Sequence, residues 1–330
     1  MTPGATDRKI DKLVDLFAKN ATVVIPGPKI ASEIGVTRST VWDYIERLRE
    51  LGVDIKGHPA TGYQLRKLPD LLLPSLIRPE LGDNVIGQRV VHYFRTGSTN
   101  DDAFKLAARG APHGTVVVAE EQTAGRGRFG RRWISEKSVG IYSSTLLRPP
   151  LAPAAAPILT LAAGVAVHHA IAIVTGLAPD IRWPNDTLLN GKKVSGILTE
   201  MQAELDRLHI VVLGIGINVN QLEMPPEIRA LATSLRMETG VVHSRVQVLV
   251  TMLKELERAY KMLLAEGNGA IARAFTEASS FARGKRIRVV SNAGEFQATT
   301  AGLEPSGALR VKREDGPEEL LVAGEIFEGK

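Results

Sequence analysis

Apolar side chains in the first fifty residues recur at spacings of three and four, which places them on one face of an α-helix. The pattern predicts helices over residues 7–17, 29–34 and 38–51, with a turn at Gly35 and a helix cap at Thr37. The predicted inward faces are Ile10, Leu13, Val14 and Phe17, then Ile30, Ala31 and Ile34, and finally Val41, Ile45 and Leu48. Two short strand patterns follow, around a turn that contains glycine and proline.

Three helices followed by a β-hairpin are the arrangement of a winged helix-turn-helix, so we expect a DNA-binding domain over residues 1–66. The start of the third helix would face the DNA groove through Arg38, Ser39, Thr40 and Trp42. The domain carries ten Lys and Arg side chains against eight Asp and Glu, although DNA affinity rests largely on phosphate neutralisation. A small helical domain that contacts other proteins is therefore the alternative.

Residues 67–82 contain three prolines, which predicts a linker between domains. Strand and helix patterns alternate over residues 83–280, so we expect an α+β domain with a mixed sheet there. The apolar run at residues 158–178 is rich in alanine and contains two histidines, which favours a buried core helix over a membrane span. Residues 281–330 return to short strand patterns, at 286–290, 295–300, 308–312 and 320–322.

Composition narrows the possible chemistry. The 330 residues carry a net charge of +5, which permits an acidic partner without requiring one. The absence of cysteine excludes disulfides, thiolate metal sites and cysteine nucleophiles. The seven histidines show no metal-ligand spacing, and neither a Walker A pattern nor a GxGxxG dinucleotide fingerprint is present. The N-terminus lacks the apolar core of a signal peptide, so we expect a cytoplasmic protein with no membrane partner.

Residues 122–132 read Gln-Thr-Ala-Gly-Arg-Gly-Arg-Phe-Gly-Arg-Arg, and we call them the Gly/Arg loop. Gly125, Gly127 and Gly130 would let the backbone adopt positive φ and approach a ligand closely. Four arginines with no acid among them supply fork-shaped donors for phosphate or carboxylate. A flexible basic loop that contacts nucleic acid is the alternative interpretation.

Three further segments carry polar side chains where strands end. Residues 96–100, Thr-Gly-Ser-Thr-Asn, join a predicted strand to a helix, where they either bind a ligand or simply cap the helix. Residues 183–186 read Trp-Pro-Asn-Asp, and the rigid proline holds the Asn and Asp in a fixed turn. Residues 190–193, Asn-Gly-Lys-Lys, predict a hairpin turn followed by two lysines, which are commonly just solvated. Gly196 in the next strand suggests close approach of a ligand to the backbone.

The chain carries, in this order, Gly97-Ser-Thr-Asn, Gln122-Thr-Ala-Gly-Arg-Gly-Arg, Trp183-Pro-Asn-Asp, Lys193-Val-Ser-Gly-Ile-Leu and Gly214-Ile-Gly-Ile-Asn. Together these segments resemble the biotin–protein ligases of the bifunctional bacterial type, the biotin operon repressor family. The resemblance implies a winged helix, a catalytic ligase domain and an SH3-like C-terminal β-barrel. Two alternatives stay open: a DNA-binding biotin sensor with vestigial ligase activity, and a lipoate or octanoyl transferase on the related fold.

The resemblance implies a reaction in two steps. Biotin and ATP, with Mg²⁺, give biotinyl-5′-AMP and pyrophosphate, and a lysine of a biotin carboxyl carrier protein then displaces AMP. The implied catalytic residues are Lys193, Arg126, Arg128 and Asp186. The implied biotin-binding residues are Ser98, Thr99, Asn100, Gln122, Gly125, Arg126, Gly127, Arg128, Lys193 and Gly196. ATP or the adenylate would contact Arg128, Arg131, Trp133, Asn185, Lys193 and Asn218, with Mg²⁺ held through the phosphates near Asp186 and Asn218.

The same resemblance implies operator DNA as a partner and a homodimer that bound adenylate favours. Residues 219–240 have few strand signals and in relatives order over the adenine, so we expect them to be mobile before ligand binds. Some relatives carry an arginine after a terminal Gly-Glu-Ile, whereas here residues 324–327 are followed by Glu328. A C-terminal contact with ATP or carrier would therefore lack that arginine.

Overall fold

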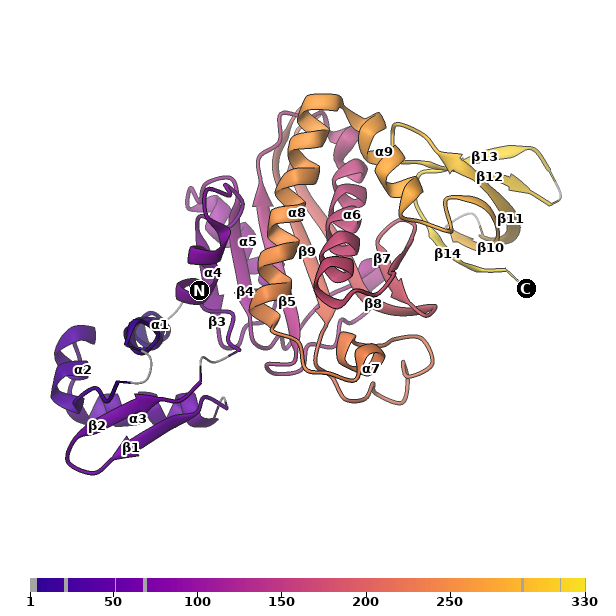
Figure 1. Cartoon of the computed structure of the whole chain (residues 1–330). Coiled ribbons are helices and arrows are strands. Elements are labelled where there is room, and N and C mark those ends of the chain that lie inside the picture. The colour runs from indigo at the N-terminus through magenta and orange to yellow at the C-terminus, as the bar shows by residue number, and fades with distance from the viewer. Residues whose placement is uncertain are drawn as a thin grey trace.

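The computed structural model describes residues 5–20, 23–50, 52–67, 70–291, 294–314 and 316–329. Figure 1 shows a small helical unit at the N-terminal end, a central sheet crossed by two long helices, and a small sheet at the C-terminal end. The order of these three parts confirms the fold class that the sequence predicts.

The N-terminal part has the predicted three helices and hairpin. Its elements are α1 (Ala5–Lys19), α2 (Gly27–Ile34), α3 (Arg38–Glu50), β1 (Ile55–His58) and β2 (Gly62–Leu65). All ten side chains predicted to face inward are buried in one cluster, so the helical periods identified the core correctly. Gly35 ends α2 with φ of 66°, and the hydroxyl oxygen of Thr37 accepts a hydrogen bond from the amide of Thr40, as a cap does.

The segment predicted as a linker has more structure than the prolines suggested. It contains α4 (Pro74–Leu81), because a proline in the first turn of a helix removes no required hydrogen bond. Leu71 and Leu73 are buried in the N-terminal core, whereas Leu72 belongs to the central core. The segment therefore joins the two cores by alternating its leucines between them.

The central sheet has seven strands in the order β3-β4-β5-β9-β8-β7-β6. Only β3 and β4 are parallel neighbours, and this confirms the mixed sheet. The strands are β3 (Val90–Tyr93), β4 (Thr115–Ala119), β5 (Gly140–Leu147), β6 (Asp180–Arg182), β7 (Asp186–Leu189), β8 (Lys192–Ala203) and β9 (Leu208–Asn218).

Helices cover both faces of this sheet. They are α5 (Thr99–Ala108), α6 (Ala156–Thr175), the short α7 (Leu235–Thr239), α8 (Arg245–Glu266) and α9 (Asn268–Glu277). Side chains alternate along β4, so Val116 and Val118 join the core under α6 and α8, while Val117 joins the core under α5. By length and composition α6 could cross a membrane, but 61% of its most apolar window is buried in the protein, as expected for a core helix.

The C-terminal part is a five-stranded antiparallel sheet in the order β13-β12-β11-β10-β14. Its strands are β10 (Arg283–Ser291), β11 (Gly294–Leu303), β12 (Leu309–Arg313), β13 (Glu318–Leu321) and β14 (Glu325–Glu328). Four of these match the predicted strands of the SH3-like domain, whereas β14 was not predicted. The indole nitrogen of Trp183 donates to the carbonyl of Gly307 at 3.0 Å, and this bond ties the sheet to the central domain.

A buried ion cluster fixes the start of α8 against the sheet and the connecting segment. The guanidinium of Arg245 lies 2.8 Å from Glu120 and 3.1 Å from Asp70, and the side chains of Arg245 and Glu120 are almost fully buried. Glu120 also accepts hydrogen bonds from the amide of Leu72 and the hydroxyl of Ser138. Burial alone would raise the pKa of Glu120, but Arg245 and its hydrogen-bond donors lower it to about 2.

Glu120→Gln should therefore destabilise the protein strongly, because it leaves the buried Arg245 short of a counter-charge. We expect a loss of about 3–5 kcal/mol in the free energy of unfolding, measured by urea denaturation at neutral pH. Glu121→Gln is the matched control, since Glu121 pairs with Arg95 at the surface, where ion pairs contribute about 1 kcal/mol or less.

The difference in free energy of unfolding between wild type and Glu120→Gln should decrease at acidic pH. Because the folded-state pKa of Glu120 is depressed, its stabilisation is complete above pH 4.5 and is lost as the pH falls toward about 2. The gap between wild type and Glu120→Gln should shrink over that range. A gap that stays constant from pH 6 to pH 3 would contradict the role assigned to this carboxylate.

Candidate active site

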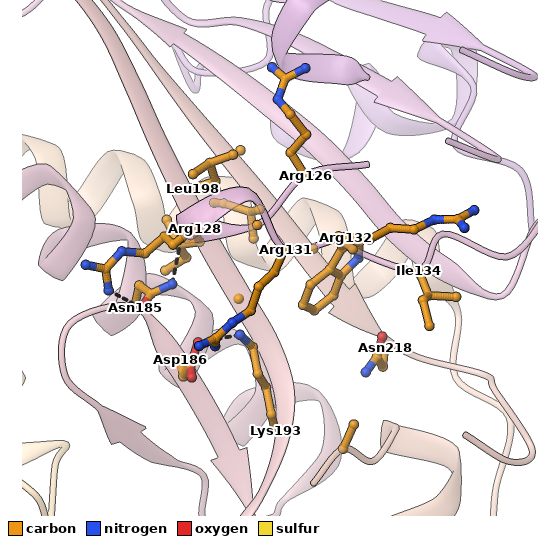
Figure 2. Close-up of a pocket in the computed structure, with 18 of the residues that line it drawn as sticks. Arg126, Arg128, Arg131, Arg132, Ile134, Asn185, Asp186, Lys193, Leu198 and Asn218 are labelled. Atoms are coloured by element: carbon orange, nitrogen blue, oxygen red, sulfur yellow. Dashed lines mark hydrogen bonds and ion pairs between the residues drawn. The ribbon is translucent and has the colours of Figure 1, made fainter. Parts of the chain in front are cut away.

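One cavity of about 510 Å³ lies where the Gly/Arg loop crosses strands β8 and β9. All the residues predicted for ligand binding and catalysis line it except Gly125. Figure 2 shows Arg128 and Arg131 beside Asn185, Asp186 and Lys193, which come from distant parts of the sequence. The sequence motifs therefore converge on one site.

The Gly/Arg loop is a closed turn held by its own backbone. The amide of Trp133 donates to Gly125 and the amide of Gly127 donates to Arg131. Positive φ occurs at Gly130, as predicted, but also at Phe129, a side chain that is 59% exposed. Gly125 has ordinary φ and is required for another reason, because a Cβ there would lie 2.6 Å from the carbonyl oxygen of Trp133. Gly127 is extended, with φ of −112°.

Polar side chains from α5 and β5 form one wall of the cavity. Ser98 stands at the N-cap of α5, but its side chain makes no capping hydrogen bond. Instead the amide and hydroxyl of Thr99 both donate to the side-chain oxygen of Gln122, at 2.8 and 3.0 Å. The simple capping interpretation is therefore wrong, because the loop supplies the cap. Ser144, which sequence reasoning missed, donates to Thr99 and Asn100 from a position that is fully buried on β5.

Lys193 is fixed by an ion pair with Asp186. Its ammonium lies 2.5 Å from one carboxylate oxygen of Asp186, and Arg182 donates to the other at 2.7 Å. Burial alone would raise the pKa of Asp186, but Lys193 and Arg182 together hold it below its ordinary value. Lys192, which precedes Lys193 on β8, is absent from the lining of the cavity, as strand alternation predicts.

The loop arginines differ in the charge of their partners. Arg126 pairs with Asp101 on α5, and Arg131 pairs with Glu325 on β14. Arg128 instead donates to two neutral oxygens, those of the Asn185 side chain and the Gly324 backbone. Burial lowers the pKa of Arg128, and the charges of Glu325 and Asp186, which do not bond to it directly, offset this only in part. Arg128 therefore has the most unsatisfied charge for an anionic ligand among these three.

The indole ring of Trp133 forms part of the floor of the cavity. A Cβ on Gly216 would lie 2.4 Å from this ring, and one on Gly196 would lie about 3.0 Å from both the ring and Lys193. Gly196 lines the cavity, where its contact with a ligand stays a prediction, and its missing side chain also makes room for Trp133 and Lys193. The ring nitrogen of Trp133 is buried without a hydrogen-bond partner among the described residues, so it remains available to an acceptor.

The side chains around the expected metal position, Asp186 and Asn218, already have partners within the protein. Asp186 is already engaged by two cations, and the side-chain amide of Asn218 donates to the carbonyl of Thr233. The described residues contain no group of three or more His, Asp or Glu side chains that fits a metal ion. The protein groups near Asp186 and Asn218 therefore do not form a divalent-cation site of their own.

Two segments that carried no strong sequence signal complete the cavity. Residues 224–232 contribute mainly apolar side chains, and Leu231 and Thr233 bond through their backbones to Lys193. This places the segment expected to cover the adenine beside Lys193, while its mobility stays a prediction. Residues 325–327 of β14 also line the cavity, and the Gly324-Glu-Ile motif was the only sequence signal for them.

The residues predicted to contact DNA lie in the other domain, on α3. Arg38, Ser39 and Trp42 are exposed, and Trp42 is 55% accessible. The hydroxyl of Thr40 is instead hydrogen-bonded to Thr37. Arg47 stacks on the ring of Phe94 at 4.8 Å, so this basic side chain serves the junction between the domains.

Known proteins share all three parts of the chain. Residues 94–218 match the Biotin/lipoate A/B protein ligase family, residues 9–64 match an HTH domain, and residues 283–328 match the Biotin protein ligase C terminal domain. The bifunctional ligase/repressor BirA of Bacillus subtilis is 39% identical over 313 residues, which cover 94% of this chain and 96% of that protein. BirA of Escherichia coli is 27% identical over 91% of each chain. The biotin protein ligase of Aquifex aeolicus, solved with biotin and ATP, gives a TM-score of 0.63 at 29% identity over 73% of this chain and 98% of that one.

The chain therefore belongs to the biotin–protein ligase family. Within that family it has the domain order of the bifunctional ligase/repressors, with a helix-turn-helix domain before the ligase domain.

Gly216→Ala should displace the indole of Trp133, because the new methyl group would overlap the ring. We expect altered near-UV circular dichroism and tryptophan fluorescence, together with at least a tenfold loss of ligand affinity, since each 1.4 kcal/mol of lost contact is about tenfold. Gly164→Ala is the matched control, because its Cβ would meet Ile181 and Phe275 at ordinary contact distance. Unchanged spectra in Gly216→Ala would show that Trp133 does not occupy this position in solution.

Proposed function

We propose that this protein is an ATP-dependent biotin–protein ligase that forms biotinyl-5′-AMP and transfers biotin to a lysine of a carrier protein. The observation that carries the proposal is the Lys193–Asp186 pair at the floor of the cavity that the Gly/Arg loop closes. The chain's membership of the family and its likeness to a ligase solved with biotin and ATP support it.

In the first step a carboxylate oxygen of biotin attacks the α-phosphorus of ATP, and the bond to the β-phosphate breaks to release pyrophosphate. Negative charge builds on the oxygens around phosphorus, so fixed cations there lower the barrier. Lys193 is a compact point charge held by Asp186, and Arg128 offers donors that no carboxylate neutralises. We assign these two side chains to the reacting phosphate.

In the second step the carrier's lysine amine attacks the acyl carbon, the bond to AMP breaks, and the amine loses a proton. Asp186 is a poor base for that proton, since two cations depress its pKa. We therefore assign it a positioning role, in which it orients Lys193 and Arg182. The polar wall of Thr99, Gln122 and Ser144 suits the ureido group of biotin, which both donates and accepts hydrogen bonds.

We propose that Mg²⁺ binds together with ATP and not to the protein alone. Because the protein groups around Asp186 do not form a divalent-cation site, we assign the ion to the phosphate oxygens of the nucleotide. Its chemistry there would be to neutralise charge on the departing pyrophosphate.

The exposed start of α3 and the repressor relatives support a second activity, binding of operator DNA in the cytoplasm. We propose that a homodimer carries it. In the described part of the chain β7 pairs with β8 only as far as Gly196 and the side chain of Asn100 donates to the carbonyl of Leu198, so residues 199–203 have no strand partner on that side. An open edge can pair with the same strand of a second copy.

Two alternatives make different predictions for the same assay. A biotin sensor with vestigial activity would bind biotin and form no carrier adduct. A lipoate or octanoyl transferase would instead attach a lipoyl or octanoyl group to the carrier. The match of residues 283–328 to the biotin ligase C-terminal domain favours biotin. Incubation with ATP, Mg²⁺ and an apo carrier domain, read by intact mass, should show one biotinyl addition that requires ATP.

Lys193→Ala should remove about 3–4 kcal/mol of transition-state stabilisation, comparable with the loss of one key oxyanion donor. Adenylate formation should therefore be slower in single-turnover experiments. Lys192→Ala is the matched control, because the neighbouring lysine does not line the cavity and should keep the wild-type rate. A loss of less than tenfold in Lys193→Ala would contradict the assignment.

Trp42→Ala should weaken operator binding by about 1–3 kcal/mol, since Trp42 is the large exposed side chain at the start of α3. The measurement is fluorescence anisotropy on duplexes selected from a random pool by the wild-type protein with biotin and ATP. Lys254→Ala, on the exposed face of α8, should bind like wild type. Equal affinity of Trp42→Ala and wild type would place the DNA contact elsewhere.

A further inference from the structure

Arg126 is directed away from the reacting groups. Figure 2 shows its side chain on the opposite side of the Gly/Arg loop from Asp186 and Lys193. Its two terminal nitrogens donate to the two carboxylate oxygens of Asp101, at 2.9 and 2.6 Å. One of them also lies 3.4 Å from a carboxylate oxygen of Glu200 on β8. Two acids thus hold one arginine of a loop that contains no acid of its own.

Glu200 is itself held by a buried neighbour. The same carboxylate oxygen accepts a hydrogen bond from the side-chain amide of Asn100 at 2.6 Å. Asn100 is 4% exposed and accepts a bond from Ser144, and it fills the space that a Cβ on Gly214 would occupy. The acid that meets Arg126 is therefore anchored in the sheet rather than free at the surface.

We propose that Asp101 and Glu200 are positioning residues that clasp Arg126 and so hold the Gly/Arg loop closed over the cavity. We call these three side chains the Arg126 clasp. The clasp fastens the middle of the loop to α5 and β8. The bonds between Thr99 and Gln122 fasten the start of the loop. The clasp itself is argued from contacts in the ligand-free protein. Only the identity of the molecule retained beneath the loop, biotinyl-5′-AMP, rests on the proposed function.

Electrostatics separates the clasp from phosphate binding. The hydrogen bond from Arg126 lowers the pKa of Asp101, so that the carboxylate stays ionised at neutral pH. An incoming phosphate at Arg126 would face two ionised carboxylates, whereas at Arg128 it would face neutral oxygens. Exposed ion pairs contribute little singly, but a bidentate pair within a network that is anchored at one end restricts the loop more strongly.

The first test uses the ligand-free protein and does not depend on activity. Hydrogen–deuterium exchange of the peptide that covers residues 122–133 should become about tenfold faster in Asp101→Asn and in Arg126→Gln, since each removes charge-assisted hydrogen bonds. Glu121→Gln is the matched control, because it breaks the surface pair with Arg95 beside the loop. Exchange in this control should stay within about twofold of wild type.

A double-mutant cycle tests the connection directly. Asp101→Asn combined with Arg126→Gln should exchange no faster than Arg126→Gln alone, because both changes open the same clasp. Additive effects would mean that the two residues act separately, and the clasp would be rejected. Glu200→Gln should give a smaller increase than Asp101→Asn, in line with its longer contact to Arg126.

The second test follows the adenylate. Asp101→Asn should release preformed biotinyl-5′-AMP about tenfold faster than wild type, while single-turnover adenylate formation stays within about twofold. Slower formation in Arg126→Gln, with unchanged exchange and release, would make Arg126 a ligand of the reacting phosphate and overturn the clasp. A wild-type protein that forms no adenylate would reject the proposed function, and the exchange experiment would still decide whether the clasp exists.

Discussion

Crowding of positive charge is the constraint on which this site depends. Lys193, Arg182 and the four arginines of the Gly/Arg loop line one cavity, and like charges crowded together repel unless acids stand between them. The structure places Asp186, Asp101 and Glu325 at those points, and each acid comes from a different element of the fold. The arrangement leaves Arg128 with neutral hydrogen-bond partners, so its charge remains available to attract an anion.

Acidic side chains also connect the three parts of the chain. Glu325 belongs to the C-terminal sheet, yet it neutralises an arginine of the central loop. Asp70 belongs to the connecting segment, yet with Glu120 it neutralises the buried Arg245 at the start of α8. The pair between Arg245 and Glu120 is buried, and such a contact is specific because an unpaired partner left in low-dielectric surroundings is costly.

Local patterns predicted much of this architecture, since helical and strand periods depend only on near neighbours. They located the winged helix, the mixed sheet and four of the C-terminal strands, and the ordered motifs identified most of the cavity. Partners far apart in sequence could not be predicted in this way. Glu325 meets an arginine 194 positions earlier, and β14 became recognisable as a strand only through its pairing with β10. The sequence pattern predicted Gly196 at the site, but nothing local reveals that Trp133 folds onto it.

The position of β14 also sets the order in which the two domains mature during synthesis. The N-terminal core is complete once Phe94, its last buried member along the chain, has emerged, and domains generally fold as units as they leave the ribosome. The cavity, in contrast, lacks one wall until residues 325–327 have been made. A nascent chain would thus present a folded DNA-recognition module long before it could hold a small molecule.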